Sequence, residues 1–349
     1  VTGAEGLVWD SGVVESDASV FVEYKGKPFQ SFSDYLWTVT ATDNTGDTAT
    51  ATSSFETGFM KREWSAQWVR SPFAMKKARK GNGGQNPAEY FRKEFVVRQG
   101  VKRARVYATC HGAYQLSING NRADDRELAP EFTLYEKYLC YQVYNVTSLL
   151  QEGHNAIGML VGDGWYDSKN FKSRDRKFKM EHAVLFETRI EYEDGTFETV
   201  LSDDKLKVAE SPVRSSDLFA GELYDAQMEQ EGWNCAGFDD GGWQNGILSG
   251  AYYDNLVVQY GEPVRPVKEV EAVGMEVSPK GETIIDFGQN LAGVLRVKVD
   301  LPAVRQNASI PLFTVHRFLG GIPAGLWPMR QHFWGIRKTS CITVTLHQE

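Results

Sequence analysis

The chain has 349 residues, 42% of them hydrophobic, and a formal net charge of −8. This length allows two or three domains that each bury their own core, and the composition excludes low-complexity and fibrous proteins. The negative charge argues against a general nucleic-acid binder, whose affinity depends on Lys and Arg that neutralise phosphates. No segment approaches the roughly 20 apolar residues of a membrane helix, so we predict neither a nucleic-acid nor a membrane partner.

The first block runs from residue 1 to residue 58 and ends in the Thr/Ala-rich strand TATATSSFETG. It holds fewer strands than the roughly seven of an immunoglobulin-like sandwich, so we expect a partial fibronectin-like or immunoglobulin-like domain whose opening strands are missing. Residues 59–86 are the predicted linker. Its end, KKARKGNGGQN, combines glycines with like charges and predicts a flexible loop, with a basic patch for a polyanion as the alternative.

The second block, residues 87–250, alternates apolar and polar residues, as antiparallel sheets with one solvent-exposed face do. In RARVYATC, alternate residues from Ala104 to Cys110 are expected to share a buried face, and AYQLSI repeats the pattern. Asn119-Gly120 and Asp194-Gly195 each predict a type I′ hairpin turn. Near the end of the block, EGWNCAGFDDGGW predicts packing tryptophans and an Asp pair in turns.

The third block, residues 257–303, contains GETIIDFGQNLAGVLRVKV, which predicts a strand that ends at Asp286, a turn at Gln289-Asn290 and a second strand. Its DFG triplet does not indicate a kinase, because the Gly-rich loop, the strand lysine and the catalytic loop are absent. The fold prediction is therefore all-β: tandem antiparallel sandwiches, with a jelly-roll-like domain between the partial first domain and the start of a further sandwich.

The last 46 residues, 304–349, differ in composition from the rest of the chain. They contain five Lys or Arg and a single acidic residue, Glu349, whereas the preceding residues contain 45 acidic residues. We interpret this tail as anomalous and frameshifted. The alternative, a metal site built from His316, His332 and His347, is poor because their spacing gives no shared helix face.

Four cysteines lie far apart, without a C-x-x-C pair that would suggest zinc or redox chemistry. We interpret them as buried thiols; they are Cys110, Cys140, Cys235 and Cys341.

Four strings in order resemble bacterial α-L-rhamnosidases of glycoside hydrolase family 78. Residues 112–166, from GAYQLSINGNR to AIGMLVGDGWY, are similar to the N-terminal sandwich domain of that family, and SDLFAGELYDAQMEQEGWNCAGFDDGGW to the end of the domain. DFGQNLAGVLRVKV resembles the strand pair that introduces the next sandwich. Upstream, YKGKPFQSFSDYLWTVTATDNTGDTATATSSFETGF with REWSAQWV looks like the fibronectin-like module and its linker.

The resemblance implies a parent enzyme that hydrolyses terminal α-L-rhamnose from glycosides with inversion, through two carboxylates in an (α/α)₆ barrel. In the family these carboxylates lie beyond the DFGQN segment. We therefore expect a chain truncated before the barrel, its missing intramolecular partner, and assign no catalytic residue. The expected role is accessory, with rhamnose-containing glycans or glycosides as ligands and a secreted or periplasmic location favoured over a cytoplasmic one. The alternatives are a stand-alone carbohydrate-binding protein and a surface adhesin.

The candidate binding residues lie in GDGWY, residues 162–166. The Asp163 carboxylate can accept hydrogen bonds from sugar hydroxyls, while Trp165 and Tyr166 can cover the apolar face and methyl group of a 6-deoxy sugar. In some family members a corresponding module binds rhamnose with calcium, and the resemblance places Asp163 at its acidic, metal-binding position. We expect Asp163 to be exposed in a loop between strands of the central sandwich.

Because calcium takes six to eight oxygens, Glu222 and Asp225 in GELYDA are candidate helpers. As a catalytic pair they are unsuited, because residues three apart on a strand point to opposite faces. The structural alternative is that Trp165 and Tyr166 close the sandwich end and Asp163 caps a turn.

Overall fold

The protein is described here by a computed structural model. It describes residues 1–18, 20–60, 64–73, 86–135, 137–166, 181–217, 221–250, 253, 255–279, 281, 283–289, 292–293, 297–298, 332–334, 341–342 and 346–347. The chain divides into two compact units, residues 1–64 and 65–349. The described residues contain no helix long and apolar enough to cross a membrane.

The first unit contains one antiparallel sheet with the strand order β2-β1-β3-β4. Its strands are β1 (Thr2–Gly3), β2 (Gly6–Leu7), β3 (Asp34–Thr42) and β4 (Thr48–Glu56). Every residue of β4 is exposed, and Tyr35 is the one buried residue of β3. Tyr35 packs against Phe29 and Phe55, with ring centroids 4.6 and 5.4 Å away. The hydrophobic contacts of this unit are therefore concentrated in a small aromatic cluster.

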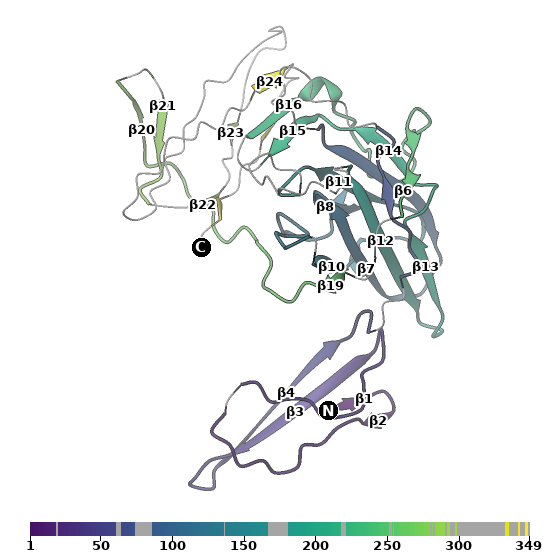
Figure 1. Cartoon of the computed structure of the whole chain (residues 1–349), viewed down its shortest axis with the longest axis vertical. Helices are drawn as coiled ribbons and strands as arrows, with labels where there is room; N and C mark the ends of the chain where they lie inside the picture. The colour runs from purple at the N-terminus through teal and green to yellow at the C-terminus, as the bar shows by residue number, and fades with distance from the viewer. Residues whose placement is uncertain are drawn as a thin grey trace. The chain divides into compact units, whose positions relative to one another are not determined.

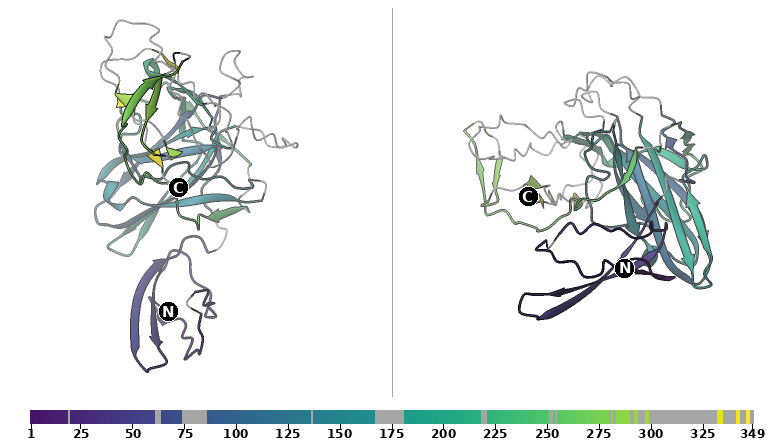
Figure 2. Two further views of the ribbon diagram at one scale, coloured as in Figure 1. Left: turned by 90° about the vertical axis from the view of Figure 1, so that its left-hand side faces the viewer. Right: turned by 60° about the horizontal axis from the view of Figure 1, so that its bottom comes forward.

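Two larger sheets form a sandwich in the second unit (Figures 1 and 2). One consists of β5 (Val69–Arg70), β7 (Val101–His111), β10 (Leu139–Asn145), β12 (Ala183–Tyr192), β13 (Phe197–Leu201), β18 (Ile247–Leu248) and β19 (Leu256–Val258). The other consists of β6 (Glu89–Val97), β8 (Ala113–Ile118), β9 (Asn121–Arg122), β11 (Gly153–Gly162), β14 (Lys207–Glu210) and β17 (Gln244–Asn245). Their pairings are antiparallel, except that β19 joins β10 in parallel.

The core lies between these two sheets and follows the predicted alternation. Alternate residues from Ala104 to Cys110 on β7 are fully buried, and Tyr114, Leu116 and Ile118 on β8 are at most 3% exposed. They belong to one hydrophobic cluster with Ile157 of β11. Burial of such side chains contributes about 1.5–3 kcal/mol each, which makes this face the main source of stability.

The two predicted hairpin turns differ. Asn119 and Gly120 both have positive φ, 50° and 84°, and join β8 directly to β9, as a type I′ turn requires. Between β12 and β13 the connection is four residues long, and Gly195 has a positive φ of 80° whereas Asp194 is not among the positive-φ residues. The prediction of a second I′ turn was wrong, because the Asp194 carboxylate accepts the backbone N–H of Thr196 and forms an Asx turn instead.

The EGWNCAGFDDGGW stretch covers the outer face of the β6 sheet, as predicted for its tryptophans. Trp233 stacks on Tyr90 with centroids 4.1 Å apart, and its ring fills the space above Gly158. Asp239 accepts the N–H of Gly241 in a turn. Asp240 also begins a turn, because its carbonyl accepts the N–H of Trp243 at 2.9 Å. Its carboxylate pairs with the buried guanidinium of Arg92, an ion pair that the sequence did not predict.

The remaining strands form small sheets. A third sheet contains β15 (Val213–Asp217), β16 (Gly221–Asp225) and β24 (His332–Trp334), while β20 (Gly274–Val277) pairs with β21 (Thr283–Asp286), β22 (Ala292–Gly293) with β26 (Leu346–His347), and β23 (Val297–Lys298) with β25 (Cys341–Ile342). Two 3₁₀ turns span Thr147–Leu149 (η1) and Ala226–Met228 (η2).

Three short strands, β24, β25 and β26, are described within the anomalous tail. The rest of the tail, with His316, lies outside the described residues, as do the side chains of His332, His347 and Cys341 and the basic loop 76–85. The frameshift interpretation therefore stays a prediction. Among the described cysteines, Cys110 and Cys140 are buried free thiols, as predicted, and Cys235 is a half-buried free thiol.

Candidate functional site

Asp163 follows β11 directly and is 1% exposed. Its Oδ2 accepts the backbone N–H of Asn86 at 3.1 Å, and its Oδ1 lies 3.0 Å from Nε2 of His182. The expectation of an exposed carboxylate in a loop was wrong, because a neighbouring strand places a histidine in front of it. Gly164 follows with a φ of 54°, and a Cβ there would lie 2.6 Å from that of Ala113.

His182 lies directly before β12 and faces two carboxylates. Its Nδ1 is 3.1 Å from Oε2 of Glu89, the first residue of β6, and its Nε2 faces Asp163. Oε1 of Glu89 accepts the hydroxyl of Ser71 at 2.6 Å. Glu89 and Asp163 belong to one sheet of the sandwich, whereas Ser71 and His182 flank strands of the other. This cluster, which we call the His182 staple, therefore joins the two sheets at one end.

The His182 staple contains a protonated, positively charged ring in the protein interior. Burial by itself would lower the pKa of His182, but hydrogen bonds to Asp163 and Glu89 and the attraction of both carboxylates raise it to about 10. All three side chains are at most 8% exposed. A buried imidazolium between two carboxylates is strongly held, and removal of one partner leaves an uncompensated buried charge.

Calcium, which the resemblance implied at Asp163, does not fit these residues. Both Asp163 oxygens already accept hydrogen bonds, and a cationic ring lies 3.0 Å from one of them. Calcium requires six to eight oxygens, and among the described residues no group of three or more Asp, Glu, His or Cys side chains could hold a metal ion. His182 lies between the two carboxylates, so they do not converge on a common point.

Beside the staple, aromatic rings from several elements form a continuous row, which we call the aromatic end. The His111 ring, at the end of β7, stacks on Trp68 with centroids 4.3 Å apart and on Tyr166 at 5.0 Å. Burial among these rings lowers the pKa of His111 to about 4, so the ring is neutral at pH 7. Tyr166 in turn contacts the edge of Tyr135 at 5.2 Å.

Trp165, the other predicted aromatic residue, is half-buried and meets Phe132 edge-on, with centroids 6.1 Å apart. Phe132 is 49% exposed, and Leu134 beside it is 65% exposed. The sequence reasoning missed Phe132 and Tyr135, although both stand in the aromatic-rich string EFTLYEKY between two strands. The aromatic end thus combines the GDGWY segment with a second segment, residues 124–135, which we call the side loop.

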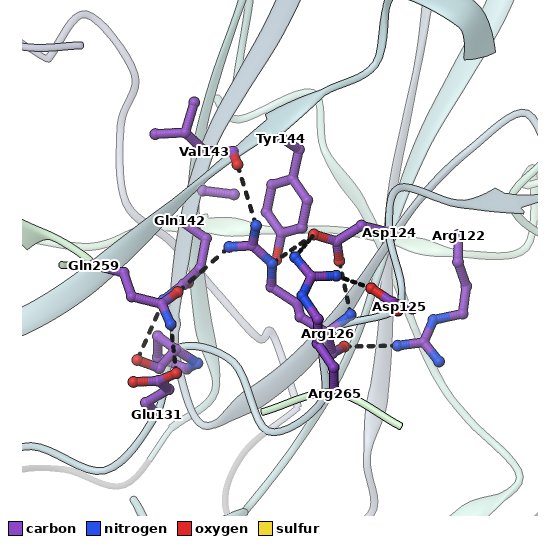
Figure 3. Close-up of polar contacts among 12 residues, drawn as sticks. Arg122, Asp124, Asp125, Arg126, Glu131, Gln142, Val143, Tyr144, Gln259 and Arg265 are labelled. Atoms are coloured by element: carbon purple, nitrogen blue, oxygen red, sulfur yellow. Dashed lines mark hydrogen bonds and ion pairs between the residues drawn. The ribbon is translucent and has the colours of Figure 1, made fainter. Parts of the chain in front are cut away.

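The side loop is fastened by a polar network around Arg126 (Figure 3). Arg126 bonds Asp124 at 2.6 Å and the carbonyl of Val143 at 3.3 Å, and its guanidinium lies 4.4 Å from the ring centre of Tyr144. Arg122 bonds the carbonyl of Arg126 at 2.8 Å. These contacts anchor the base of the loop on β10.

A strap, residues 255–265, holds the other side of the same loop. Gln259 accepts from Arg126 at 3.4 Å and donates to Glu131, and Arg265 pairs with Asp124 at 3.6 Å (Figure 3). Backbone contacts add to this, because the N–H of Glu127 donates to Val264 at 2.8 Å. The strap contains β19 and continues toward β20, so the side loop that carries Phe132 is held by residues beyond the predicted domain end at 250.

Glu222 and Asp225 both lie on β16 and do not converge. Glu222 stands opposite Ser216 of β15, whose hydroxyl lies 2.5 Å from where a Cβ on Gly162 would be. Paired residues share a face, so the Glu222 side chain lies on the face of the hairpin that borders the start of GDGWY. Burial raises its pKa. Asp225, three residues on, lies on the opposite face and accepts the N–H of Gln227 at 3.1 Å, which caps η2.

Two family models match the chain. Residues 99–268 match the α-L-rhamnosidase N-terminal domain, and residues 1–61 match the N-terminal immunoglobulin domain of Rha78A-like proteins. This chain carries the N-terminal β-domains of the α-L-rhamnosidase family. The resemblance seen in the sequence is thus confirmed, together with the all-β, immunoglobulin-like and sandwich architecture.

Individual α-L-rhamnosidases are also similar to this chain in sequence. One from Streptomyces avermitilis is 38% identical over 216 residues, which are 61% of this chain and 21% of that protein. One from Formosa agariphila is 28% identical over 314 residues, which are 84% of this chain and 33% of that protein. The chain thus spans a third or less of the length of these relatives.

Solved structures of α-L-rhamnosidases also superpose on this chain. The α-L-rhamnosidase from Dictyoglumus thermophilum superposes with a TM-score of 0.82 at 30% identity, over 97% of this chain and 39% of that one. A Streptomyces avermitilis α-L-rhamnosidase complexed with L-rhamnose superposes with a TM-score of 0.78 over 97% of this chain and 49% of that one; at 22% identity it supports the fold alone.

Proposed function

We propose that this chain is the accessory β-domain region of an α-L-rhamnosidase and that its aromatic end binds rhamnosides. The observation that carries the proposal is the pairing of Trp165 with the half-exposed Phe132, contributed by two separate loops. Exposed apolar patches on soluble domains mark binding surfaces, because they lower stability unless a ligand covers them.

The chemistry of the aromatic end suits a 6-deoxy sugar. Phe132 and Trp165 offer ring faces and edges to the apolar face and methyl group, and tyrosine hydroxyls lie close by on Tyr135 and Tyr166. Asp163 takes a different role from the one first predicted, since it holds the loop. Glu222 is our candidate acceptor for a sugar hydroxyl, and Asp225 is assigned to the η2 cap.

Hydrolysis of the glycosidic bond is proposed to require parts of the parent protein outside this chain. Inversion needs an acid and a base on opposite sides of one bond, about 6.5–9.5 Å apart. Glu222 and Asp225 lie on opposite faces of β16, so they cannot flank one sugar. We expect no release of p-nitrophenol from p-nitrophenyl α-L-rhamnoside above a buffer blank. Turnover that Glu222→Gln abolishes would overturn the accessory role.

Calorimetric titration with L-rhamnose tests the binding role. We expect a millimolar to high-micromolar Kd, roughly 4 to 6 kcal/mol, because a monosaccharide offers one stacking face and few hydroxyl contacts. Trp165→Ala and Phe132→Ala should each weaken binding about tenfold or more. Trp37→Ala, which removes a 38% exposed tryptophan in the first unit, is the matched control and should change nothing.

L-mannose sharpens the test, because it differs from L-rhamnose by a hydroxyl on the C6 carbon. The aromatic end should bind it more weakly, since the hydroxyl would lose water against the rings. Equal binding of both sugars, or no heat at millimolar L-rhamnose, would contradict the proposed site.

A further inference from the structure

His182 is the one described histidine whose two ring nitrogens both face carboxylates. We infer that His182 is a built-in cation that holds the GDGWY loop through Asp163, and that it makes binding at the aromatic end independent of calcium. The first half of this inference stands on the geometry of the staple. The second half rests on the proposed function.

The charge of the ring follows from hydrogen bonding. A neutral imidazole donates from a single nitrogen, so one of the two carboxylates, at 3.0 and 3.1 Å, would face a lone pair. Asp163 and Glu89 are 1% and 8% exposed at their side chains, so water does not relieve that repulsion. The doubly protonated ring satisfies both carboxylates, and the raised pKa of His182 agrees with this arrangement.

The His182 staple is directly connected to the GDGWY loop, because Asp163 belongs to both. Asp163 begins the turn that carries Trp165 and Tyr166, and its second oxygen holds the N–H of Asn86 from the neighbouring segment. Among the described residues, no second cation pairs with either carboxylate. His111, paired across from Ala183, is neutral, and Arg70 is engaged by Glu181 at 3.0 Å. His182 is therefore a positioning residue for the loop and has no predicted contact with sugar.

A nitrogen NMR experiment on the whole chain tests the charge directly. With ¹⁵N-labelled histidine, both ring nitrogens of His182 should carry protons at pH 7, whereas His111 should show one protonated and one free nitrogen. His182→Asn identifies the signals. A neutral His182 ring at pH 7 would overturn the inference, whether or not the chain binds a sugar.

Chemical rescue tests the positioning role. His182→Ala should lower the Tm and weaken L-rhamnose binding at least tenfold, and millimolar imidazole at pH 6.5, supplied as the cation, should restore a large part of both. His154→Ala, which removes an exposed histidine at the far end of β11, should change neither quantity, with or without imidazole. A His182→Ala protein that keeps wild-type Tm would contradict the staple.

The third experiment tests whether stability and L-rhamnose binding depend on calcium. In the wild-type chain, EDTA or millimolar CaCl₂ should leave both the Tm and the Kd for L-rhamnose unchanged. A rise in Tm or in affinity with calcium, abolished by Asp163→Asn, would overturn the inference. If the wild-type chain binds no L-rhamnose at all, the proposed function fails, while the NMR and Tm readouts still decide the role of His182.

Discussion

Two histidines at the same end of the sandwich have opposite electrostatic surroundings. His111 ends β7 and pairs with Ala183, the first residue of β12, and His182 directly precedes Ala183. His111 is packed between the rings of Trp68 and Tyr166, and burial lowers its pKa to about 4. His182 is more completely buried than the half-buried His111, but two carboxylates outweigh burial and raise its pKa to about 10.

The difference shows that burial alone does not set the charge of a side chain. What decides it is whether the neighbours are rings, which do not compensate a charge, or carboxylates, which do. The two surroundings have separate functions in this protein: the neutral ring extends the aromatic end, and the charged ring fixes the loop beside it. A mutation or a change of pH can disrupt the surroundings of one histidine without disrupting those of the other.

The largest expected effect is that of Asp163→Ala, which removes one carboxylate from the staple. The loss should be roughly 3–5 kcal/mol of unfolding free energy, because a buried charge loses its partner and Asn86 loses an acceptor. Urea unfolding followed by tryptophan fluorescence measures it. Asp239→Ala, at an exposed turn, is the control and should cost within about 1 kcal/mol. Equal losses for the two variants would contradict a buried staple.

Alkaline pH should break the staple without a mutation. The folded pKa of His182, about 10, lies above the unfolded value of 6.5, so its contribution is complete below about pH 6.5 and disappears as the pH rises through 10. Between pH 8 and 11 the sandwich should lose about 2–3 kcal/mol through this group. His182→Asn, which has no such proton, should show a smaller decline over the same range. Parallel pH curves for the two proteins would refute the assignment.

Acid pH should act on His111 in the opposite sense. Because its folded pKa lies below the unfolded value, the unfolded chain takes up the proton first, and stability falls as the pH drops from about 6.5 toward 4. His111→Phe keeps a stacked ring without that proton, so it should remove roughly 2–2.5 kcal/mol of the acid loss. Thermal unfolding at pH 7 and pH 4.5 gives the comparison. A variant as acid-sensitive as wild type would show that folding does not lower the pKa of His111.

The smallest effect is expected outside both histidines, at the strap. Arg265 is 37% exposed in its pairs with Asp124 and Asp125, so Arg265→Ala should cost at most about 1 kcal/mol. The difference should shrink in 0.5 M NaCl, because salt screens exposed charges, whereas the Asp163→Ala loss should persist. If the loss of unfolding free energy in Arg265→Ala did not depend on salt, the ion pairs of Arg265 would be shielded from solvent, as those of His182 are.

Much of the fold could be predicted because the sandwich has a period of two. The buried face from Ala104 to Cys110 and the I′ turn at Asn119-Gly120 follow from local rules on side-chain alternation and positive φ. The four-residue connection at Asp194 did not follow, because Asx-turn chemistry competes with the I′ geometry for the same dipeptide. Local rules are reliable where one conformation is clearly preferred.

The site was predicted only in part. GDGWY stood out because a carboxylate flanked by glycines and aromatic residues is unusual, but its carboxylate was expected in water and calcium was assigned to it. His182 is 19 residues away in the sequence and Glu89 is 74 away, and no local pattern brings them together. The same holds for Phe132, which meets Trp165 across two loops.

By itself, the sequence determined the strand alternation, the tandem β-architecture and the family, because these depend on neighbouring residues or on strings that can be read in order. The tertiary structure decided the charge of His182, the neutrality of His111 and the pairing of the two aromatic loops. Those properties depend on which strands lie side by side, and electrostatic and stacking energies fall off within a few ångströms. A contact between distant segments therefore gives each side chain its chemical role.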